Sequence, residues 1–475
     1  MKTTTIRNII FLVLGLFIVI SACKKEAPPT PEVPPVITTP TTPAGTTYLP
    51  PSMQRSGGNA ALGEAFIKTG NFAYAGIPYP QFPLSSSTNE LGRTGHNATI
   101  PFSYTEVDAF NGVKVVAPNC LTCHATYLDN TFILGLGSTT GDYRTDPSAN
   151  VASLDAYISG VYGGTSSPEY QAYEPFSNAL KAIGPHVLTN TQGVNPADKY
   201  ALILAAHRDK DDLTWLPTPS APIPAEVVPT DVPAWWLLKK KNAMYYNGNG
   251  QGDFAKIIMA SSLLSVKDSS YARIVDNQFV DVLEYLKSIE APAYTQTINS
   301  TDAEAGKTIF TNNCAKCHGT YGGTETYPNL WVDLNTIQTD PMLANGHMVS
   351  AYFTGWYNDS WFGIGGNAGK MVPHNGYVAP PLDGIWATAP YLHNGSVPDL
   401  VTLLKSPSRP AYWTRTFATT DYNYTNVGWN YSASTSASAN CYNTTIMGYN
   451  NTGHTFGDHL NDSDRMKLIE YLKTL

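Results

Sequence analysis

Two stretches far apart in the chain share one pattern of apolar and polar positions. Arg465–Leu475, with the sequence RMKLIEYLKTL, places apolar side chains on one helical face at Leu468, Ile469, Leu472 and Leu475. Phe279–Ile289, with the sequence FVDVLEYLKSI, follows the same pattern and shares the tetrapeptide Glu-Tyr-Leu-Lys with it. Asn461 is a suitable N-cap for the later stretch. Both stretches predict amphipathic helices that cover a hydrophobic core.

A second helix is predicted upstream of each of these stretches. Thr301 followed by Glu304 forms a capping box, which predicts a helix that begins there. Ala61–Gly70, with the sequence ALGEAFIKTG, is a weaker echo of that helix. The repeated arrangement indicates a duplicated domain with a linker near residues 291–300. The alternative is that two amphipathic helices share a common tetrapeptide.

The N-terminus has the pattern of an export signal. Lys2 and Arg7 precede the apolar run Asn8–Ile20, and the segment ISAC that follows ends in Cys23 and resembles a bacterial lipobox. This pattern predicts a lipoprotein signal peptide over residues 1–22 and lipidation of Cys23. A single transmembrane anchor is the alternative, but the apolar run is short for a membrane span.

Residues 23–51 are rich in Pro and Thr and predict an extended tether. A lipid anchor, a tether and a globular body together predict a lipoprotein of the cell envelope, on the periplasmic side or in the outer membrane. The lipid anchor would then hold the protein on a membrane.

Composition indicates a globular body and excludes one class of partner. The chain has 475 residues and a formal net charge of -8, which argues against a nucleic-acid partner. Aromatic residues make up 11% and charged residues 14% of the chain, and the many Gly and Pro residues favour long ordered loops. The acidic balance suits a small basic electron carrier as partner, although a solvated acidic surface is the commoner explanation.

Two pairs of cysteines are each followed by a histidine. Cys120, Cys123 and His124 belong to the segment CLTCH, and Cys314, Cys317 and His318 belong to CAKCH. A C-x-x-C-H motif binds haem through two thioethers, and its histidine binds the iron. The two motifs predict two covalently bound haem c groups, with His124 and His318 as iron ligands.

Two other readings of the four cysteines are weaker. A zinc site would have to join pairs that lie nearly 200 residues apart in the chain. A thioredoxin-like redox pair would need one motif in a βαβ setting. Cys441 has no evident partner, and a buried free thiol is its simplest explanation.

The fold class that follows is mainly α, with two cytochrome c-like haem domains, long loops and little β structure. We expect an N-terminal cytochrome c-like haem domain over residues 52–292 and a C-terminal cytochrome c domain over residues 300–475.

The sequence resembles the di-haem cytochrome c peroxidase superfamily. Ala379–Leu404, APPLDGIWATAPYLHNGSVPDLVTLL, resembles the TAPY-x-H-x-G signature of that superfamily. Asp231–Tyr246, DVPAWWLLKKKNAMYY, the segment GLGS that ends at Ser138, and the C-terminal GHTFGDHLNDSDRMKLIEYLKTL are closer to the branch of rubber-oxygenase-like di-haem c-type cytochromes.

The resemblance implies a second iron ligand at the C-terminal haem. His454, in NNTGHTF, matches a position that supplies a distal histidine in the rubber-oxygenase branch, opposite His318. Peroxidases of the superfamily use a Met after the signature, whereas residues 394–446 of this chain contain none. Met371 is the main alternative, and His374 and His459 are further ones.

The resemblance also implies roles for residues near the two haems. Trp235 or Trp236 resembles a tryptophan found between the haems, although core packing explains a Trp pair equally well. The carbonyl groups of Thr388 and Pro390 match positions that help to hold Ca²⁺. His393 is placed near a haem or the domain interface, and not on iron.

The first haem differs from the second because no sixth ligand lies close to its motif in sequence. Residues 125–185 contain no His, so the displaceable histidine of the gated peroxidases is missing. His186, His207 and Met259 are remote candidates that are more often structural. The working hypothesis is that the haem held by His124 binds O₂ or H₂O₂.

Three functions remain open from the sequence. One is an oxidoreductase that passes electrons between two haems and activates O₂ or H₂O₂ at the first, with a small molecule or an apolar polymer as substrate. The others are a di-haem cytochrome c peroxidase fed by a donor protein and a lipoprotein that only transfers electrons. A vacant or displaceable iron site distinguishes the first from the last.

Overall fold

The computed structural model describes residues 42–83, 88–349 and 351–475, without the side chains of residues 347–349. The predicted signal peptide (1–22), the lipidation site Cys23 and most of the predicted tether (23–51) therefore lie outside the described residues. Thr42–Leu475 forms one compact unit. Among the residues that the structure describes, no helix is both long and apolar enough to cross a membrane.

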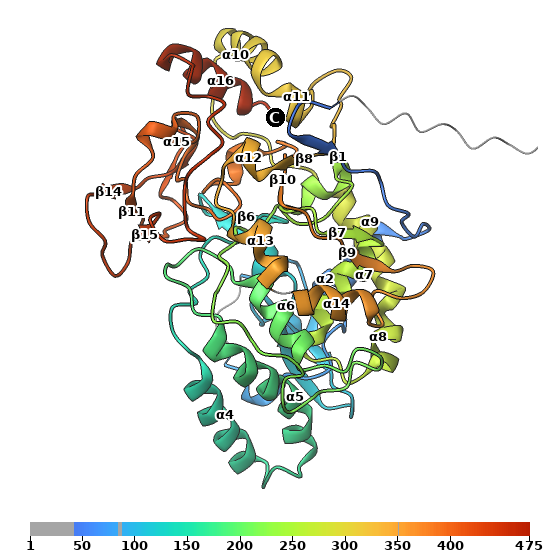
Figure 1. The fold of residues 1–475 in the computed structure, drawn as a ribbon. Helices are drawn as coiled ribbons and strands as arrows, with labels where there is room; N and C mark the ends of the chain where they lie inside the picture. Colours follow the sequence, from blue (N-terminus) through green and yellow to red (C-terminus); the bar gives the residue numbers. More distant parts are fainter. Residues whose placement is uncertain (1–41, 84–87, 350) are drawn as a thin grey trace, which may run out of the picture. The chain divides into compact units, whose positions relative to one another are not determined.

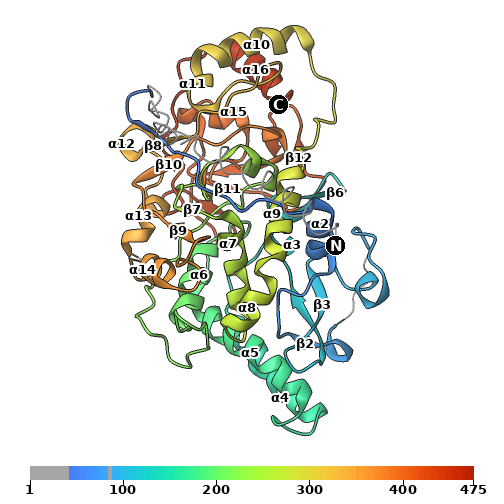
Figure 2. The same ribbon diagram turned by 90° about the vertical axis from the view of Figure 1, so that its right-hand side faces the viewer.

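Two helix pairs organise the two halves of this unit. Helix α2 (Ala60–Thr69) packs on α9 (Gln278–Ser288), and α10 (Ser300–Asn313) packs on α16 (Asp462–Leu472). Both views of the ribbon show α10 beside α16 near the C-terminus (Figures 1 and 2). These are the four helices that the sequence pattern predicted. The two halves therefore repeat the same helix pair in sequence and in packing.

Asparagine side chains begin three of these four helices. Asn461 caps α16 as predicted, with its side chain accepting a hydrogen bond from the backbone N–H of Asp464. The cap of α10 was predicted two residues too late, because Asn299 and not Thr301 supplies it. Asn59 caps α2 in the same way. The backbone N–H groups of Asn59 and Asn299 donate to Asp281 (2.7 Å) and Glu470 (2.9 Å) of the partner helices.

Each helix pair crosses at a glycine. A Cβ atom added to Gly63 would lie 2.0 Å from the carbonyl oxygen of Asp281, and one added to Gly306 would lie 1.9 Å from that of Lys467. Asp281 and Lys467 are equivalent positions, because each lies three residues before the glutamate of the shared Glu-Tyr-Leu-Lys segment. The two halves therefore repeat the same close approach of two backbones.

Replacing Gly306 or Gly63 by alanine is expected to lower the free energy of unfolding by about 2 kcal/mol or more, since the backbone carbonyl cannot yield as a side chain can. Gly355→Ala is the control, because Gly355 lies in helix α14 with open space around it. That change should be neutral or stabilise by up to about 1 kcal/mol. Chemical denaturation of the three variants measures these differences, and equal effects in all three would contradict the close-crossing interpretation.

Apart from α4 and α5, which have 14 and 16 residues, the other helices are short, and long loops join them. They are α3 (Leu121–His124), α4 (Ser148–Val161), α5 (Pro168–Ile183), α6 (Ala197–Ala206), α7 (Phe254–Ile258), α8 (Ser269–Asp276), α11 (Ala315–His318), α12 (Leu334–Ile337), α13 (Met342–Val349), α14 (Ala351–Asp359) and α15 (Leu400–Leu403). The 3₁₀ helix η4 (Trp235–Lys240) connects the two halves of the unit.

Strands are few and form small antiparallel sheets. Three sheets have three strands: β1 (Thr46–Tyr48), β8 (Leu330–Asp333) and β10 (Gly376–Val378); β2 (Ile77–Pro78), β4 (Lys114–Pro118) and β3 (Tyr104–Asp108); and β14 (Ser432–Ser434), β11 (Tyr412–Thr414) and β15 (Tyr442–Asn443). Three have two: β5 (Ala125–Leu128) with β6 (Thr131–Leu134), β7 (Gly250–Gly252) with β9 (Gly369–Met371), and β12 (Tyr422–Asn423) with β13 (Gly428–Trp429). The prediction of a mainly α fold with little β structure is confirmed.

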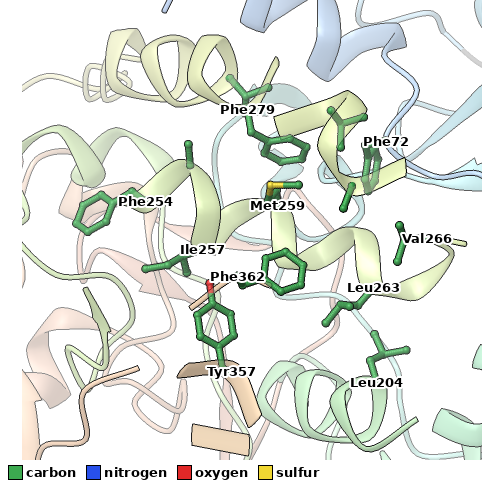
Figure 3. Packing of buried hydrophobic residues seen from close by; sticks show 14 of the residues in the cluster. Phe72, Leu204, Phe254, Ile257, Met259, Leu263, Val266, Phe279, Tyr357 and Phe362 are labelled. Carbon is green, nitrogen blue, oxygen red and sulfur yellow. The ribbon is translucent and has the colours of Figure 1, made fainter. Parts of the chain in front are cut away.

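Two large hydrophobic clusters form the cores of the two halves. The first cluster contains Phe279 and Met259, which Figure 3 shows side by side, and the second contains Phe310 and Leu468. Each cluster also contains residues from the other half of the sequence. Residues 356–371 pack into the first cluster, and residues 128–136 and Trp236 pack into the second. Chain segments therefore cross between the two cores on both sides of the predicted linker.

Candidate haem sites

The second C-x-x-C-H motif presents a neutral histidine that is oriented by a backbone carbonyl. Its histidine ends the short helix α11, and Cys314 and Cys317 are free thiols. His318 Nδ1 lies 2.8 Å from the carbonyl oxygen of Pro380. Burial lowers the pKa of His318, so the ring is neutral, with its proton on Nδ1 and its Nε2 lone pair available to a metal.

His454 faces His318 at the spacing of two ligands on one iron. The ring centroids lie 6.3 Å apart, with an angle of 61° between the ring planes. Two imidazoles bound on opposite sides of one metal, each through a bond of about 2 Å, would place their centroids roughly 6 Å apart. Burial, with help from His318 and Arg409, lowers the pKa of His454 to about 3. Both rings are therefore neutral, as iron ligation requires.

The loop that carries His454 is held by a partly buried arginine. Arg409 donates five hydrogen bonds to backbone carbonyl groups, at 2.6 to 3.2 Å, and the acceptors belong to Thr402, Leu403, Asn451, Gly453 and His454. His454 itself has a positive φ of 45°, and its backbone N–H donates to the carbonyl of Ile337 at 2.8 Å. The sequence analysis missed Arg409, because a single Arg in a Ser- and Pro-rich segment carries no motif.

The other candidates for this position lie in different surroundings. Met371 is buried in the first hydrophobic cluster, with its backbone paired to the side chain of Asn358. His374 lies 2.8 Å from the amide of Gln251 through Nε2, and its ring is 5.4 Å from that of Trp331. His459 is exposed. The structure brings His454 to His318 and places these three elsewhere.

The first motif also presents thiols and a neutral histidine. Cys120 and Cys123 are free, and Asn195 donates to the sulfur of Cys123 at 3.2 Å. Burial raises the pKa of Cys120 to about 12 and that of Cys314 in the second motif to about 11. A thioredoxin-like redox cysteine has a lowered pKa, so these thiols do not fit that alternative. Within the described ranges, no group of three or more His, Cys, Asp or Glu side chains could hold a metal ion, so the four cysteines do not form a zinc cluster.

His124 is covered on one side by Trp235. The two rings are stacked, with centroids 4.8 Å apart and an angle of 21° between their planes. Burial lowers the pKa of His124 to about 4, and the nearby Pro233 carbonyl acts in the opposite direction. That carbonyl does not meet hydrogen-bond geometry with Nδ1, which is without a partner among the described residues. His124 is thus less firmly oriented than His318.

The remote candidates for a sixth ligand at the first haem are engaged in packing. The ring of His207 stacks on Trp215 at 4.8 Å, and its Nδ1 lies 2.8 Å from the carbonyl of Leu216. Met259 is fully buried among aromatic and aliphatic side chains (Figure 3). His186 ends a 3₁₀ turn after α5 and is partly exposed. In the described part of the chain, the ring that contacts His124 is that of Trp235.

The paired tryptophans of η4 face different cores. Trp235 packs in the first cluster, and Trp236 packs in the second. Nε1 of Trp236 donates to the carbonyl of Asp383 at 2.8 Å, three residues after Pro380. One short helix therefore reaches from the first motif histidine to the loop that orients the second.

The two remaining predictions concern the signature segment. Pro390 is joined to Ala389 by a cis peptide bond, Thr388 precedes this pair, and a Ca²⁺ site there stays a prediction. His393 is buried, and its ring stacks on Tyr377 with centroids 4.1 Å apart. Its carbonyl accepts a hydrogen bond from the backbone N–H of Asp231 at 2.7 Å, which ties the signature to the segment before η4.

Lowering the pH from about 6.5 to 4 is expected to cost a few kcal/mol of stability through His393. Burial lowers the pKa of this side chain to about 4, while the nearby Asp340 acts in the opposite direction. Because the folded-state pKa lies below that of the unfolded chain, the stabilisation is complete above pH 6.5 and is lost as the pH falls toward 4.

His393→Phe keeps an aromatic ring against Tyr377 and removes the titration. The variant should lose less stability than the wild type over this pH range, as measured by thermal unfolding of the holoprotein. Burial raises the pKa of Asp231 to about 7, so this group stabilises the fold as the pH falls, opposite to His393. Because Asp231 is present in both proteins, its contribution cancels in the difference between the wild type and His393→Phe. Parallel stability curves for the two proteins would show that His393 does not titrate in this way.

Comparison with known proteins places cytochrome c sequences in the C-terminal half. Residues 303–394 match the cytochrome c family model, and residues 376–414 match a family described as RoxA-like, cytochrome c-like. The first of these ranges includes the second C-x-x-C-H motif, and the second includes the loop of Pro390 and His393.

Two relatives come from Sinorhizobium fredii (strain NBRC 101917 / NGR234). The uncharacterized protein y4iM is 29% identical over 297 residues, which cover 53% of this chain and 66% of y4iM. The uncharacterized protein y4iJ is 38% identical over 108 residues, which cover 21% of this chain and 18% of y4iJ. The chain thus spans just under two thirds of the first relative and less than a fifth of the second.

The matches and the local geometry agree on the chemistry of the C-terminal site. The matches indicate that the C-terminal half of the chain binds haem c covalently, as cytochrome c does, and that part of it is similar to RoxA-like, cytochrome c-like sequences. The matches do not single out the di-haem peroxidase superfamily. Free thiols and a neutral, oriented histidine fit haem c at the second motif, and free thiols beside a neutral histidine fit it at the first.

Proposed function

We propose that this protein is an exported di-haem c-type cytochrome that passes electrons between its two haems and activates O₂ or H₂O₂ at the first. The observation that carries the proposal is the difference between the two motif histidines. His318 has a second histidine opposite it at 6.3 Å, whereas His124 has a stacked tryptophan beside it. Among the side chains that the structure describes, a second histidine lies at this spacing from His318 and none is found at a comparable position beside His124.

His318 and His454 suit a site that only transfers electrons. Each would bind iron through Nε2, and the Pro380 carbonyl holds His318 in one orientation. Arg409 fixes the backbone on either side of His454. A pair of imidazoles favours a lower reduction potential than histidine with methionine, because thioether favours Fe(II). With haem bound, these residues would hold the iron from both sides and would leave no position for a small ligand.

His124 suits a site that can accept a small ligand. It would hold the first haem iron from one side, and the described alternatives His207 and Met259 are occupied by other contacts. Haem with a vacant or displaceable position supplies redox chemistry on O₂ or peroxide when bound. Trp235 covers one face of the His124 ring, and burial lowers the pKa of that ring to about 4, so it is neutral at pH 7.

The proposal includes the lipid anchor at Cys23, a place in the cell envelope and no nucleic-acid partner. The second reactant is an electron-carrying protein or a small molecule. Electron transfer alone is the alternative function, and the cytochrome c match over residues 303–394 favours it, since that family description carries no oxygen chemistry. The absence of a Met between residues 394 and 446 speaks against the peroxidase alternative.

The test is the consumption of O₂ or H₂O₂ by the purified holoprotein, with and without a reduced cytochrome donor. Haem content should be two per chain, and consumption should be lost in His124→Ala while the second haem is retained. Consumption that needs the donor and peroxide would favour the peroxidase alternative. Two haems per chain with no consumption under any condition would leave electron transfer alone.

A further inference from the structure

Lys240, the last residue of η4, contacts three groups around the second motif. Its Nζ lies 2.6 Å from Asp383 and 2.9 Å from Glu325, and 4.9 Å from the ring centroid of Tyr321. The Lys240 side chain is 19% exposed, and Asp383 is 18% exposed, so this ion pair is partly withdrawn from water. Desolvation acts to lower the pKa of Lys240, but Asp383 and Glu325 outweigh it and raise the pKa. Lys240 is therefore a fixed cation.

The partners of Lys240 are the residues that hold His318. Tyr321 donates through its hydroxyl to the carbonyl of His318 at 2.9 Å, and the same hydroxyl accepts from the backbone N–H of Leu382 at 2.6 Å. Asp383 follows Leu382 in the loop whose Pro380 carbonyl orients the His318 ring. Lys240 thus lies beside Tyr321, which binds the backbone carbonyl of His318. It also contacts the loop whose Pro380 carbonyl binds the His318 ring.

The same η4 helix contacts the first motif at its other end. Trp235 stacks on His124, and Trp236 donates to the backbone carbonyl of Asp383. Asp383 is therefore bound twice by η4, through its carbonyl by Trp236 and through its carboxylate by Lys240. The loop that contains Pro380 and Asp383 is thus joined to η4 by two hydrogen bonds.

We propose that Lys240 is a positioning residue that sets the reduction potential of the second haem. This inference rests on the proposed function, in that it assumes haem c on the second motif. A cation fixed beside the residues that contact His318 would favour Fe(II) in a haem bound there, because Fe(II) carries one positive charge less than Fe(III). Asp383 opposes Lys240 in charge and keeps it in place. Removing Lys240 is therefore expected to lower the reduction potential of the second haem, and removing the Asp383 carboxylate is expected to raise it.

The test is a redox titration of the second haem, followed by its low-spin signal in electron paramagnetic resonance. Lys240→Met should make this haem harder to reduce, by about 3- to 10-fold in the ferrous to ferric ratio at a fixed ambient potential. A tenfold change corresponds to about 59 mV for one electron. Asp383→Asn should shift the ratio in the opposite direction, and the double variant should lie between the two single variants.

Lys239→Met is the matched control. Lys239 is the neighbouring residue of η4, and its partner Glu290 is 79% exposed, so solvent screens that pair. This variant should move the ratio less than twofold. Lys240→Arg, which keeps the charge, should stay within about threefold of the wild type.

A purely structural role of Lys240 predicts a different result. Lys240→Met and Asp383→Asn would then shift the ratio in the same direction, because both break the same contact. That outcome, or an equal shift in Lys239→Met, would overturn the inference. If Lys240→Met lost the second haem, Asp383→Asn would still measure the sign of the charge effect, and Lys240→Arg would show whether a cation at this position is enough to retain the haem.

Haem analysis of the wild type separates this inference from the proposed function. Fewer than two haems per chain would contradict the proposed function, while the potential of a haem on the second motif would remain measurable. Two haems with unchanged potentials in Lys240→Met would contradict only the role of Lys240.

Discussion

Replacing His454 by alanine is expected to convert the second haem from low spin to high spin. In the wild type, two imidazoles at 6.3 Å would bind the iron from both sides and give a strong axial field. Without His454 that field is lost, and the site should bind CO or cyanide, which the wild-type site should exclude. Optical and electron paramagnetic resonance spectra of the ferric protein measure the change, and His318 should still hold the haem.

His459→Ala is the matched control for this variant, because His459 lies five residues later and is exposed. It should leave both haem spectra unchanged. His454→Met should restore a low-spin haem with a higher potential, since a thioether favours Fe(II). If His454→Ala kept the wild-type spectrum and Met371→Leu changed it, Met371 would be the ligand and the assignment of His454 would be wrong.

Replacing Arg409 by methionine is expected to lower the free energy of unfolding by about 3 kcal/mol and to release His454 from iron in part of the molecules. The five carbonyl groups that Arg409 binds belong to two segments, and one of them carries His454. Burial lowers the pKa of Arg409 to about 10, so it remains charged at neutral pH. Methionine fills much of the same space but leaves these carbonyls without a donor. Denaturation curves and the high-spin fraction of the second haem measure the two effects.

Lys405→Met is the control for the loss of a cation from the same region. Lys405 forms an exposed ion pair with Asp462, and its loss should cost at most about 1 kcal/mol without a change of spin state. Arg409→Lys should retain the charge but only part of the hydrogen bonding, and should fall between the wild type and Arg409→Met. A destabilised Arg409→Met protein with a fully low-spin second haem would show that the arginine supports the fold without positioning His454.

The helix pairs could be predicted from the sequence because their signals are local. A period of 3.6 residues and a capping residue are read within one segment, and the shared Glu-Tyr-Leu-Lys marks equivalent positions in both halves. The glycines at the crossings are visible only in the structure, since nothing in the sequence tells which carbonyl lies over Gly63 or Gly306. The cap of α10 was misplaced because Asn299, Ser300 and Thr301 are all suitable capping residues.

The residues of the candidate site could be predicted from the sequence where covalent haem attachment requires a motif. Residues whose roles depend on tertiary contacts could not be predicted. The C-x-x-C-H spacing identifies four cysteines and two histidines without a structure. His454 came from a resemblance, and the structure now places it opposite His318. Arg409 and Lys240 carry no motif, because their partners are backbone carbonyls and carboxylates far away in sequence. The role of Trp235 was ambiguous until its stacking on His124 was known.

The central claim is that the two irons have different axial ligation. Electron paramagnetic resonance of the ferric holoprotein, before and after addition of cyanide, tests it most directly. We expect one low-spin signal from the haem bound by His318 and His454, which cyanide leaves unchanged, and a second signal from the haem held by His124, which cyanide converts. Two six-coordinate low-spin haems, neither of which responds to cyanide, would contradict it.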